Sequence, residues 1–243
     1  MAIAQTDRPD MDTPHMDGPQ PDMDTPHMDT LFSARALLPD EPLALDAAFR
    51  LRHAVFAHEL GWVPGARCGR ERDRCDDLAT HFAVYTPPGP PPATSPRLVG
   101  YARVLLPEHG LMLQREFSAL LAGQPRPWDP RVAFEVSRFV VRSGQRGRLG
   151  PDGRGAVEHL ARAIATWAIA HGRTEWLSVC EVRHVRALRL RGLPFARFGR
   201  VVEYQSGVPV CAARLDLPRA AARLRVRRPA DYAWYMERMR PLC

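Results

Sequence analysis

FEVSRFV, residues 134–140, decides the fold, because it sets two charged side chains inside an apolar stretch. β-Branched and aromatic residues are frequent from residue 132 to residue 141, so we expect a strand there. Strand alternation gives Glu135 and Phe139 one face and Arg138 the other. A charge buried in a strand costs several kcal/mol unless it is paired. This strand must therefore meet oppositely charged side chains from other parts of the chain.

Arginines upstream of this strand are the obvious candidate partners for Glu135. Residues 98–106, LVGYARVLL, predict a second strand, and this strand carries Arg103. Arg52 lies on an expected helix that Asp46 caps and that Gly61 ends. Because ion pairs that only stabilise a fold are common, the residues alone leave a structural and a functional role equally open.

Three carboxylates follow this helix within six residues, at Glu71, Asp73 and Asp76. Trp62 stands between the end of the helix and this group. Taken alone, the three carboxylates are typical of a solvated acidic turn. They gain interest only if Arg52 and the strand arginines reach them.

The remaining apolar segments mix strands and helices without strict alternation. We expect strands at 81–85, 176–180, 201–204 and 208–215, and helices at 156–171, 183–191 and 231–239. The proline-rich residues 87–96 and the Gly/Arg-rich residues 144–155 read as loops. This mixture suggests a single α/β domain of three layers with a mixed sheet, and we place that domain at residues 31–243.

Residues 1–30 differ from the rest of the chain. They repeat MDTPHMD at residues 11–17 and 23–29, and they are rich in Asp, Pro and Met without apolar periodicity. Such a composition cannot bury enough apolar surface to fold. We expect a disordered acidic leader here.

The composition indicates in which cellular compartment the protein works and which types of site it contains. Five cysteines form no Cys-x-x-Cys pair and nine histidines are scattered, which argues against a disulfide framework and a metal site. The sequence has no run of 18 apolar residues, so we expect no membrane span. The first residues also lack the pattern of a secretory signal. These features predict a cytoplasmic protein.

The positive charge is concentrated after the leader. Residues 1–30 carry seven Asp and one Arg, a net charge of −6. Because the whole chain has a formal net charge of +7, the remaining residues carry about +13. All basic side chains are Arg. The field favours an acidic partner, but no helix-turn-helix, zinc-finger or RNP-like string accompanies it. We therefore expect no nucleic acid, and consider an acidic carrier protein or a phosphate-bearing cofactor.

The order of polar and aromatic residues resembles the acyl-homoserine-lactone synthase family, the LuxI-type autoinducer synthases. The resemblance runs from about residue 44 to residue 216, and its most specific segments are VFAHELGW at 55–62 and FEVSRFVV at 134–141. The matching positions are Arg52, Phe56, Trp62, Glu71, Asp73, Asp76, Arg103, Glu135, Arg138 and Phe139.

This resemblance implies a fold and a reaction. Members of the family have a GNAT-like domain, an N-acyltransferase fold whose mixed central sheet splays apart to admit a pantetheine arm. They transfer an acyl group from a thioester to the amine of S-adenosylmethionine, close a lactone and release methylthioadenosine. The product is a quorum-sensing signal. S-adenosylmethionine is a substrate here, and no cofactor is implied.

The resemblance also implies roles for the matching residues. We expect Glu135 to be the general base, with Arg103 and Arg138 in the catalytic group. The S-adenosylmethionine side is expected to comprise Arg52, Phe56, Trp62, Glu71, Asp73 and Asp76, of which the charged residues mainly position the pocket. Phe56 and Trp62 could cover the adenine or the sulfonium, or they could belong to the core.

The acyl side rests on fewer residues. Ser178 and Phe139 are expected to line the acyl pocket. The Ser178 hydroxyl could bond an oxygen on the acyl C3 atom, or it could satisfy a backbone group.

The acyl donor is expected to be acyl carrier protein, with acyl-CoA possible. Six arginines could meet the acidic face of a carrier, or could form a solvated basic surface: Arg142, Arg146, Arg148, Arg154, Arg189 and Arg191. The GNAT signature for CoA is half present, because Gly153 and Gly155 supply its end while Gly150 stands where Gln or Arg is expected. This pattern favours the carrier protein.

Two other functions remain open at this point. A related N-acyltransferase that takes another amine, such as ornithine, would explain Glu135 and the strands but not the group around Trp62. A non-catalytic basic binding protein would lose affinity with salt and would be indifferent to Glu135→Gln. Chain length of the acyl group, its oxidation or branching, and the oligomeric state are not encoded in any pattern that we find.

Overall fold

The computed structural model describes residues 31–64, 68–88, 95–121, 123, 127–190, 192–204 and 207–237. One seven-stranded sheet has the order β1-β2-β3-β4-β5-β7-β6. Its strands are β1 Ser33–Ala36, β2 Thr80–Thr86, β3 Arg97–Leu105, β4 Ala133–Val141, β5 Glu175–Glu181, β6 Ala196–Tyr204 and β7 Val208–Asp216. The predicted leader at residues 1–30 lies outside the described residues.

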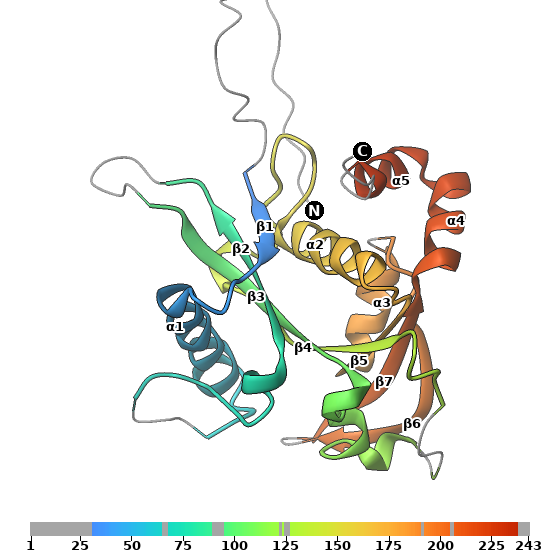
Figure 1. Cartoon of the computed structure of the whole chain (residues 1–243), viewed down its shortest axis with the longest axis horizontal. Helices are drawn as coiled ribbons and strands as arrows, with labels where there is room; N and C mark the ends of the chain where they lie inside the picture. Colours follow the sequence, from blue (N-terminus) through green and yellow to red (C-terminus); the bar gives the residue numbers. More distant parts are fainter. Residues whose placement is uncertain are drawn as a thin grey trace, which may run out of the picture.

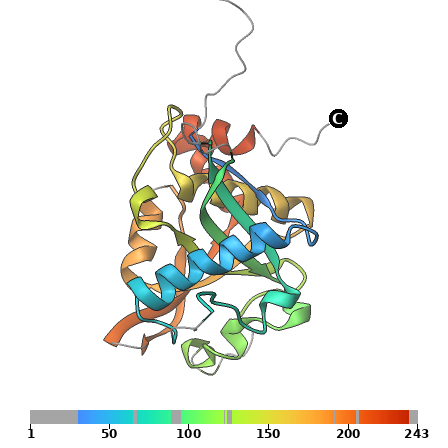
Figure 2. The same ribbon diagram turned by 90° about the vertical axis from the view of Figure 1, so that its left-hand side faces the viewer.

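Helices cover both faces of this sheet (Figure 1). The helices are α1 Pro42–Arg52, α2 Ala156–Ala170, α3 Val182–Leu190, α4 Leu217–Arg227 and α5 Pro229–Met236. α1 crosses one face, as the side view in Figure 2 shows, and α2 lies behind the other. Short 3-10 turns between β3 and β4 extend the α1 layer. The predicted three-layer α/β architecture with a mixed sheet is confirmed.

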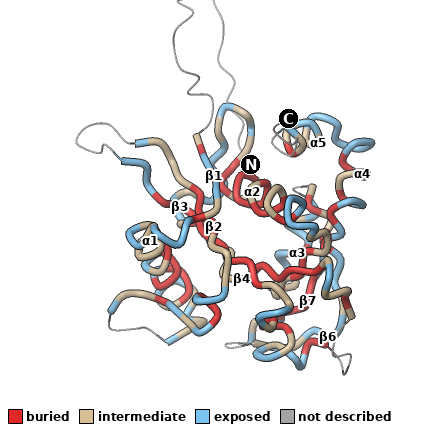
Figure 3. The backbone as a smooth tube through the Cα atoms, in the orientation of Figure 1, coloured by how far each residue is buried: buried red, intermediate tan, exposed pale blue. Residues whose placement is uncertain are grey.

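α2 forms the centre of the larger core. Its sequence is rich in alanine, which favours helix, and Glu158 accepts the backbone N–H of Gly155 at 3.1 Å at the helix start. Leu160 and Ile164 are fully buried against the sheet. Figure 3 shows the buried residues concentrated along α2 and the central strands. This packing fixes β4 and β5, which carry the candidate site.

β4 and β5 are the only parallel neighbours in the described sheet, and they pair over a short length. Their register runs from Ala133 opposite Glu175 to Glu135 opposite Leu177. Beyond this point β4 continues beside β3 and β5 continues beside β7. The two strands therefore part directly after Glu135, which is the splayed geometry that the family resemblance implies.

The start of α1 differs from the sequence prediction. The helix begins at Pro42, which occupies the first turn, four residues before the proposed cap Asp46. Proline is favoured at this position because its missing N–H has no partner there anyway. The Asp46 carboxylate instead accepts Arg50 Nε at 2.8 Å and also binds Arg70. After Arg52, the helix continues as a π-helix over His53–Glu59.

α4 and β1 were not expected from the sequence. Three buried residues on one side of α4, Leu217, Ala220 and Leu224, face the core while its arginines face solvent. Asp216 caps the helix by accepting the backbone N–H of Arg219 at 2.8 Å. Because this apolar stripe is narrow and arginines stand between its residues, the helical pattern is not recognisable in the sequence.

Within the described part of the chain, no helix combines the length and the apolar character that crossing a bilayer requires.

Candidate active site

Two fully buried arginines from different elements meet at one carboxylate. Arg52 lies at the end of α1 and Arg103 on β3, and neither side chain is exposed to solvent. The Asp76 Oδ1 atom accepts Arg52 Nη1 at 2.6 Å and Arg103 Nη1 at 2.7 Å. Burial disfavours the charged form of Asp76, but its bonds to the arginines outweigh this effect and hold its pKa below the usual range.

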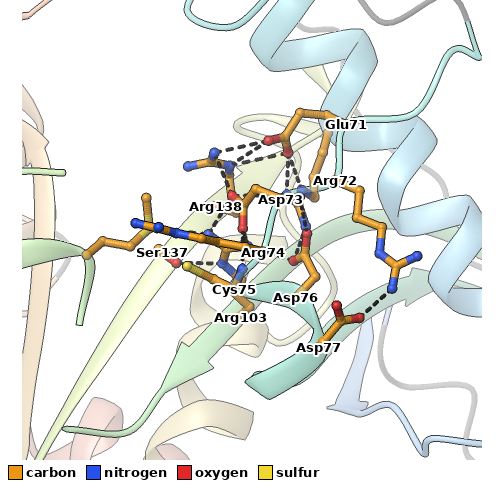
Figure 4. A network of polar contacts seen from close by, with 12 residues as sticks. Glu71, Arg72, Asp73, Arg74, Cys75, Asp76, Asp77, Arg103, Ser137 and Arg138 are labelled. Carbon is orange, nitrogen blue, oxygen red and sulfur yellow. Dashed lines mark hydrogen bonds and ion pairs between the residues drawn. The ribbon is translucent and has the colours of Figure 1, made fainter. Parts of the chain in front are cut away.

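Asp73 joins Arg103 to β4. Arg103 donates to both oxygens of Asp73, at 2.6 Å and 2.8 Å, and Arg138 donates to Oδ2 at 2.9 Å (Figure 4). Burial opposes ionisation of Asp73, yet Arg103 and Arg138 hold its pKa far below the ordinary value. Arg103 also donates from Nε to the Ser137 hydroxyl at 2.9 Å.

Glu71 closes the network on the side of α1. Its carboxylate binds Arg52 and accepts Arg138 Nε at 3.1 Å and Nη2 at 3.0 Å. The network now contains three arginines and three carboxylates, so its formal charge is balanced. The predicted alternative of a solvated acidic turn is excluded, because these carboxylates are enclosed by arginine side chains.

The acidic loop is shaped by its own carboxylates. Asp76 accepts the backbone N–H of Asp73 at 2.7 Å, and Asp73 accepts that of Cys75 at 2.8 Å. The His81 ring supports this loop from the sheet. Its Nε2 atom lies 2.9 Å from the carbonyl oxygen of Asp76, and its other ring nitrogen lies 2.6 Å from the Tyr101 hydroxyl. The sequence carries no signal for this support, since His81 and Tyr101 come from two different strands.

A bulge in β4 brings Arg138 to the network. The register between β3 and β4 shifts between Tyr101 and Arg103, so that Arg138 and Phe139 both stand opposite Ala102. Arg138 has a φ of 54°, a conformation that is rare outside glycine. Such an inserted residue reverses the alternation that follows it.

This bulge makes the strand alternation predicted from the sequence wrong. Arg138 lies on the same face as Glu135 and contacts Glu71, whereas Phe139 packs with the cluster around α2. The alternation rule assumes a regular ladder, and a single residue with positive φ breaks it. Arg138 thereby lies on the same face of β4 as Glu135 rather than on the opposite one.

An aromatic pair borders the network. The rings of Phe56 and Trp62 stack with centroids 6.1 Å apart, and the Arg138 guanidinium lies 5.6 Å from the centroid of Phe56. Phe56 is buried and Trp62 is partly exposed. Both rings belong to the apolar cluster under α1, so the core role that the sequence left open is present. A role of Phe56 or Trp62 in covering the substrate stays a prediction.

Glu135 occupies the inner end of the site, beside the point where β4 and β5 part. It is 1% exposed, and its Oε2 atom accepts the backbone N–H of Leu113 at 3.2 Å. Burial raises the pKa of Glu135 to about 7, although the backbone bonds from Leu113 and Met112 and the charge of Arg103 oppose the shift. Leu113 belongs to a short 3-10 turn whose contribution the sequence did not suggest.

Ser178 lies across the parting of the strands. Its hydroxyl donates to the Val136 carbonyl oxygen at 3.0 Å and accepts the indole N–H of Trp176 at 2.9 Å. Of the two roles left open for Ser178, the bond to a backbone group is present. A role of Ser178 or Phe139 in acyl binding stays a prediction.

The arginines proposed for carrier binding have different environments. Arg146 binds Glu59 and donates to the Val141 carbonyl oxygen at 2.8 Å, Arg154 binds Asp231 of α5, and Arg189 donates to the Phe195 carbonyl oxygen at 2.5 Å. Arg142 is half-buried and Arg148 is exposed, while Arg191 lies outside the described residues. Arg154 thus has a structural task, and carrier contact stays a prediction for all six.

Among the described residues, no three His, Cys, Asp or Glu side chains gather as a metal site. The carboxylates of Glu71, Asp73 and Asp76 are instead paired with arginines.

Residues 40–223 match a model of the autoinducer synthase family, which is more than half of the chain. The chain belongs to the autoinducer synthase family. It is similar to the acyl-homoserine-lactone synthase of Rhizobium radiobacter, with 33% identity over 66% of this chain and 73% of that protein. It is also similar to that of Ralstonia nicotianae, with 32% identity over 72% of this chain and 84% of the relative. The chain is accordingly an acyltransferase, and the resemblance found in the sequence is confirmed.

Solved structures agree on the fold. The acyl-homoserine lactone synthase LasI superimposes with a TM-score of 0.62 at 24% identity, covering 77% of this chain and 90% of LasI. BjaI, a CoA-dependent acyl-homoserine lactone synthase solved with S-adenosylmethionine and isopentyl-CoA, gives a TM-score of 0.64 at 22% identity, covering 86% and 89%. These likenesses confirm the GNAT-like sheet. The roles of individual site residues are not tested by them.

Proposed function

We propose that this enzyme transfers an acyl group from acyl carrier protein to the amine of S-adenosylmethionine and then closes the lactone. The amine nitrogen attacks the thioester carbonyl, the thiolate leaves on the carrier, and an amide forms. The carboxylate oxygen of the methionine part then attacks the carbon bound to sulfur. This carbon–sulfur bond breaks, methylthioadenosine leaves, and the acyl-homoserine lactone remains.

Glu135 is the proposed general base for the first step. An α-ammonium has a pKa of about 7.7–8.0, so only a modest base is needed to free the amine near neutral pH. The pKa of about 7 that burial gives Glu135 is close to that of the amine. A base matched in this way takes the proton directly or through one water and can later release it.

The charge-balanced network has a positioning role in this proposal. Because Arg52, Arg103 and Arg138 neutralise the three carboxylates, the network offers little net charge to a cationic substrate. Its fixed geometry instead holds the Arg138 guanidinium 5.6 Å from the centroid of the Phe56 ring. The stacked aromatic pair with Trp62 at its open side would cover the sulfonium or adenine, a contact worth about 0.5–2 kcal/mol.

Lactone closure requires less acid–base catalysis than the acyl transfer. The sulfonium is already a good leaving group, so holding the carboxylate oxygen in line with the carbon–sulfur bond is the main requirement. The rigid loop around Asp73 and Asp76 supports such orientation, since its backbone N–H groups are held by its own side chains.

The thioester arm has a place between β4 and β5. Beyond Glu135 the backbone of β4 has no pairing to β5, so an extended arm could lie along it with the carbonyl near Glu135. The half-present CoA signature and the arginines around the α2 start favour the carrier protein as donor. Turnover with matched hexanoyl donors tests this: kcat/KM should be higher for the carrier protein than for CoA.

The buried, solvent-excluded Glu135 carboxyl beside the ion network carries the proposal. Glu135→Gln keeps the size but removes the base, and we expect kcat to fall by about 10²–10⁴-fold. Glu181→Gln is the matched control, because Glu181 is 4% exposed on the neighbouring strand and binds Arg183 outside the network. Equal turnover of the Glu135 variant and the control would remove Glu135 from the mechanism.

Release of methylthioadenosine separates this function from its rival. A related acyltransferase acting on ornithine would form an amide without methylthioadenosine. Incubation of the enzyme with S-adenosylmethionine and a panel of acyl donors should yield equimolar lactone and methylthioadenosine. Absence of both across the panel would refute the proposed function.

A further inference from the structure

Two cysteines stand directly opposite each other on neighbouring strands. Cys180 of β5 is the register partner of Cys211 of β7, and the two strands run antiparallel. Side chains of such a pair lie on the same face of a sheet, and both cysteines pack with the core around α2. Both thiols are free, with Cys211 buried and Cys180 half-buried.

The spacing of this pair suits a disulfide. The Cα atoms of directly opposite residues in an antiparallel pair are about 4.5–5.5 Å apart, and a disulfide joins Cα atoms that are about 4.4–6.8 Å apart. β5 and β7 pair without a register shift along the whole of β5, from Glu175 to Glu181. The sheet therefore holds the two cysteines at this spacing, and a bond between their sulfurs needs little backbone movement.

A hydrogen bond joins the two sulfurs. The Cys180 thiol donates to the Cys211 sulfur, which raises the pKa of Cys180 and lowers the pKa of Cys211. The positive charge of Arg197 on the adjacent strand β6 also lowers the pKa of Cys211, while burial opposes this shift. Because the thiolate is the reactive form of cysteine, Cys211 is the nucleophile of the pair.

We propose that Cys180 and Cys211 form a peroxide-sensitive thiol pair that closes to a disulfide. The Cys211 thiolate attacks one oxygen of hydrogen peroxide, the O–O bond breaks, and hydroxide leaves. The Cys180 sulfur then attacks the resulting sulfenic acid. The S–S bond forms, the S–O bond breaks, and water leaves with the Cys180 proton. The two sulfurs are oxidised, the peroxide is reduced to hydroxide and water, and a thiol reductant reverses the change.

This pair lies close to the opening between β4 and β5. Ser178, two residues before Cys180, donates its hydroxyl proton to the Val136 carbonyl oxygen at 3.0 Å across this opening. A disulfide holds the two Cβ atoms about 3.8 Å apart, closer than the about 4.5–5.5 Å of an unlinked cross-strand pair. Disulfide formation therefore draws the end of β5 towards β7 and away from β4.

The consequence for turnover rests on the proposed function, in which the acyl thioester lies between β4 and β5. Movement of β5 away from β4 weakens the bond between Ser178 and Val136 and widens this opening. Oxidation then loosens the contacts of the thioester arm and raises the KM for the acyl donor.

Mass spectrometry tests the disulfide without any turnover. The full chain with Cys68→Ser, which removes an exposed thiol outside the pair, is reduced, treated with hydrogen peroxide, alkylated and digested with trypsin. We expect a linked pair of the peptides 174–183 and 201–214, each of which contains one cysteine. The same chain with Cys180→Ser, a side chain of similar size, is the matched control and should give no linked pair.

Lactone assays test the consequence. After peroxide, the KM for the acyl carrier protein thioester should rise about two- to tenfold, which is the effect of losing one neutral hydrogen bond. The KM for S-adenosylmethionine should stay unchanged, because the cysteines pack on the α2 face of the sheet. Dithiothreitol should restore the first value, and the Cys180→Ser control should not respond to peroxide.

Two results would overturn the inference while leaving the proposed function intact. Peptides that stay unlinked after peroxide mean that the pair does not close. A disulfide that leaves the KM for the acyl donor unchanged means that oxidation does not act on the acyl side. If the reduced enzyme forms no lactone from any donor, the proposed function itself fails, whereas the peptide analysis still decides whether the disulfide forms.

Discussion

The two faces of β4 are held by opposite kinds of contact. On the α1 face, Glu135 and Arg138 take part in a site where arginines and carboxylates are enclosed together. On the α2 face, Phe134 and Val136 pack among alanines and leucines of the larger core. The ionic group on the α1 face lies between two smaller apolar clusters, which contain Ala133 and Val140 of β4.

The two faces of β4 therefore contribute differently to the stability of the fold and to the geometry of the site. Apolar burial on the α2 face contributes stability in proportion to area and tolerates small shape changes. Buried ion pairs roughly break even against apolar replacements, yet removing one partner is strongly destabilising. The ion pairs on the α1 face therefore fix the geometry of the site, while apolar clusters on both faces contribute to folding stability.

Removing Arg103 should give the largest effect. Arg103→Ala leaves Asp73 and Asp76 without their shared cation, and we expect the free energy of unfolding to fall by about 3–5 kcal/mol. Turnover should also be lost. Urea unfolding and lactone assays at low temperature measure the two effects.

Leu160→Ala on the opposite face is the matched control for Arg103→Ala. It should cost about 2–5 kcal/mol through a cavity, but folded molecules should keep their KM for S-adenosylmethionine. Arg103→Lys should not restore activity, since an ammonium cannot donate in the two-pronged manner that Asp73 receives. If Arg103→Lys has wild-type activity, the two-pronged geometry of Arg103 is not required, and the proposed difference between the two faces of β4 is wrong.

The pH dependence should sharpen the contrast within the α1 face. Because burial raises the pKa of Glu135 to about 7, kcat/KM should fall about tenfold per unit as the pH drops below this value. Glu135→Gln should lack this limb in its residual activity. A rate that rises on acidification would exclude Glu135 as the base.

The same shift in the pKa of Glu135 makes the stability of the fold depend on pH. The folded pKa of Glu135 lies above its ordinary value of 4.5, so its contribution to stability is present below pH 4.5 and is lost as the pH rises towards 7. Asp73 has a lowered pKa, so its contribution is present above its ordinary pKa and is lost as the pH falls.

Trp62 should give the smallest effect. Its ring is partly exposed and stacks on Phe56, so Trp62→Leu should raise the KM for S-adenosylmethionine by about two- to thirtyfold through loss of the cation–π contact. Stability should change little. Ile169→Ala removes an exposed apolar side chain on the α2 side and should leave this KM unchanged.

The sequence predicted most elements because their local patterns agree with the fold. The strand and helix around residues 132–141 and 156–171 have strong apolar periodicity, and the structure places β4 and α2 within two residues of these bounds. Glu135 and Arg138 stood out because charges in an apolar strand need partners, whereas the acidic group at residues 71–76 gained its expected role only through the family resemblance. Their pairing was beyond the sequence, since Arg52, Asp76 and Arg103 meet across 24 to 27 positions of chain.

By itself, the sequence determined the family, the strands and helices, and the set of charged and aromatic residues from which the site is made. Local backbone preference and apolar spacing act over a few residues, and they leave a readable trace. The bulge at Arg138 and the raised pKa of Glu135 were decided only by tertiary structure. Each depends on contacts between segments that are distant in the sequence and on the exclusion of water by these segments. Local sequence patterns do not encode such contacts.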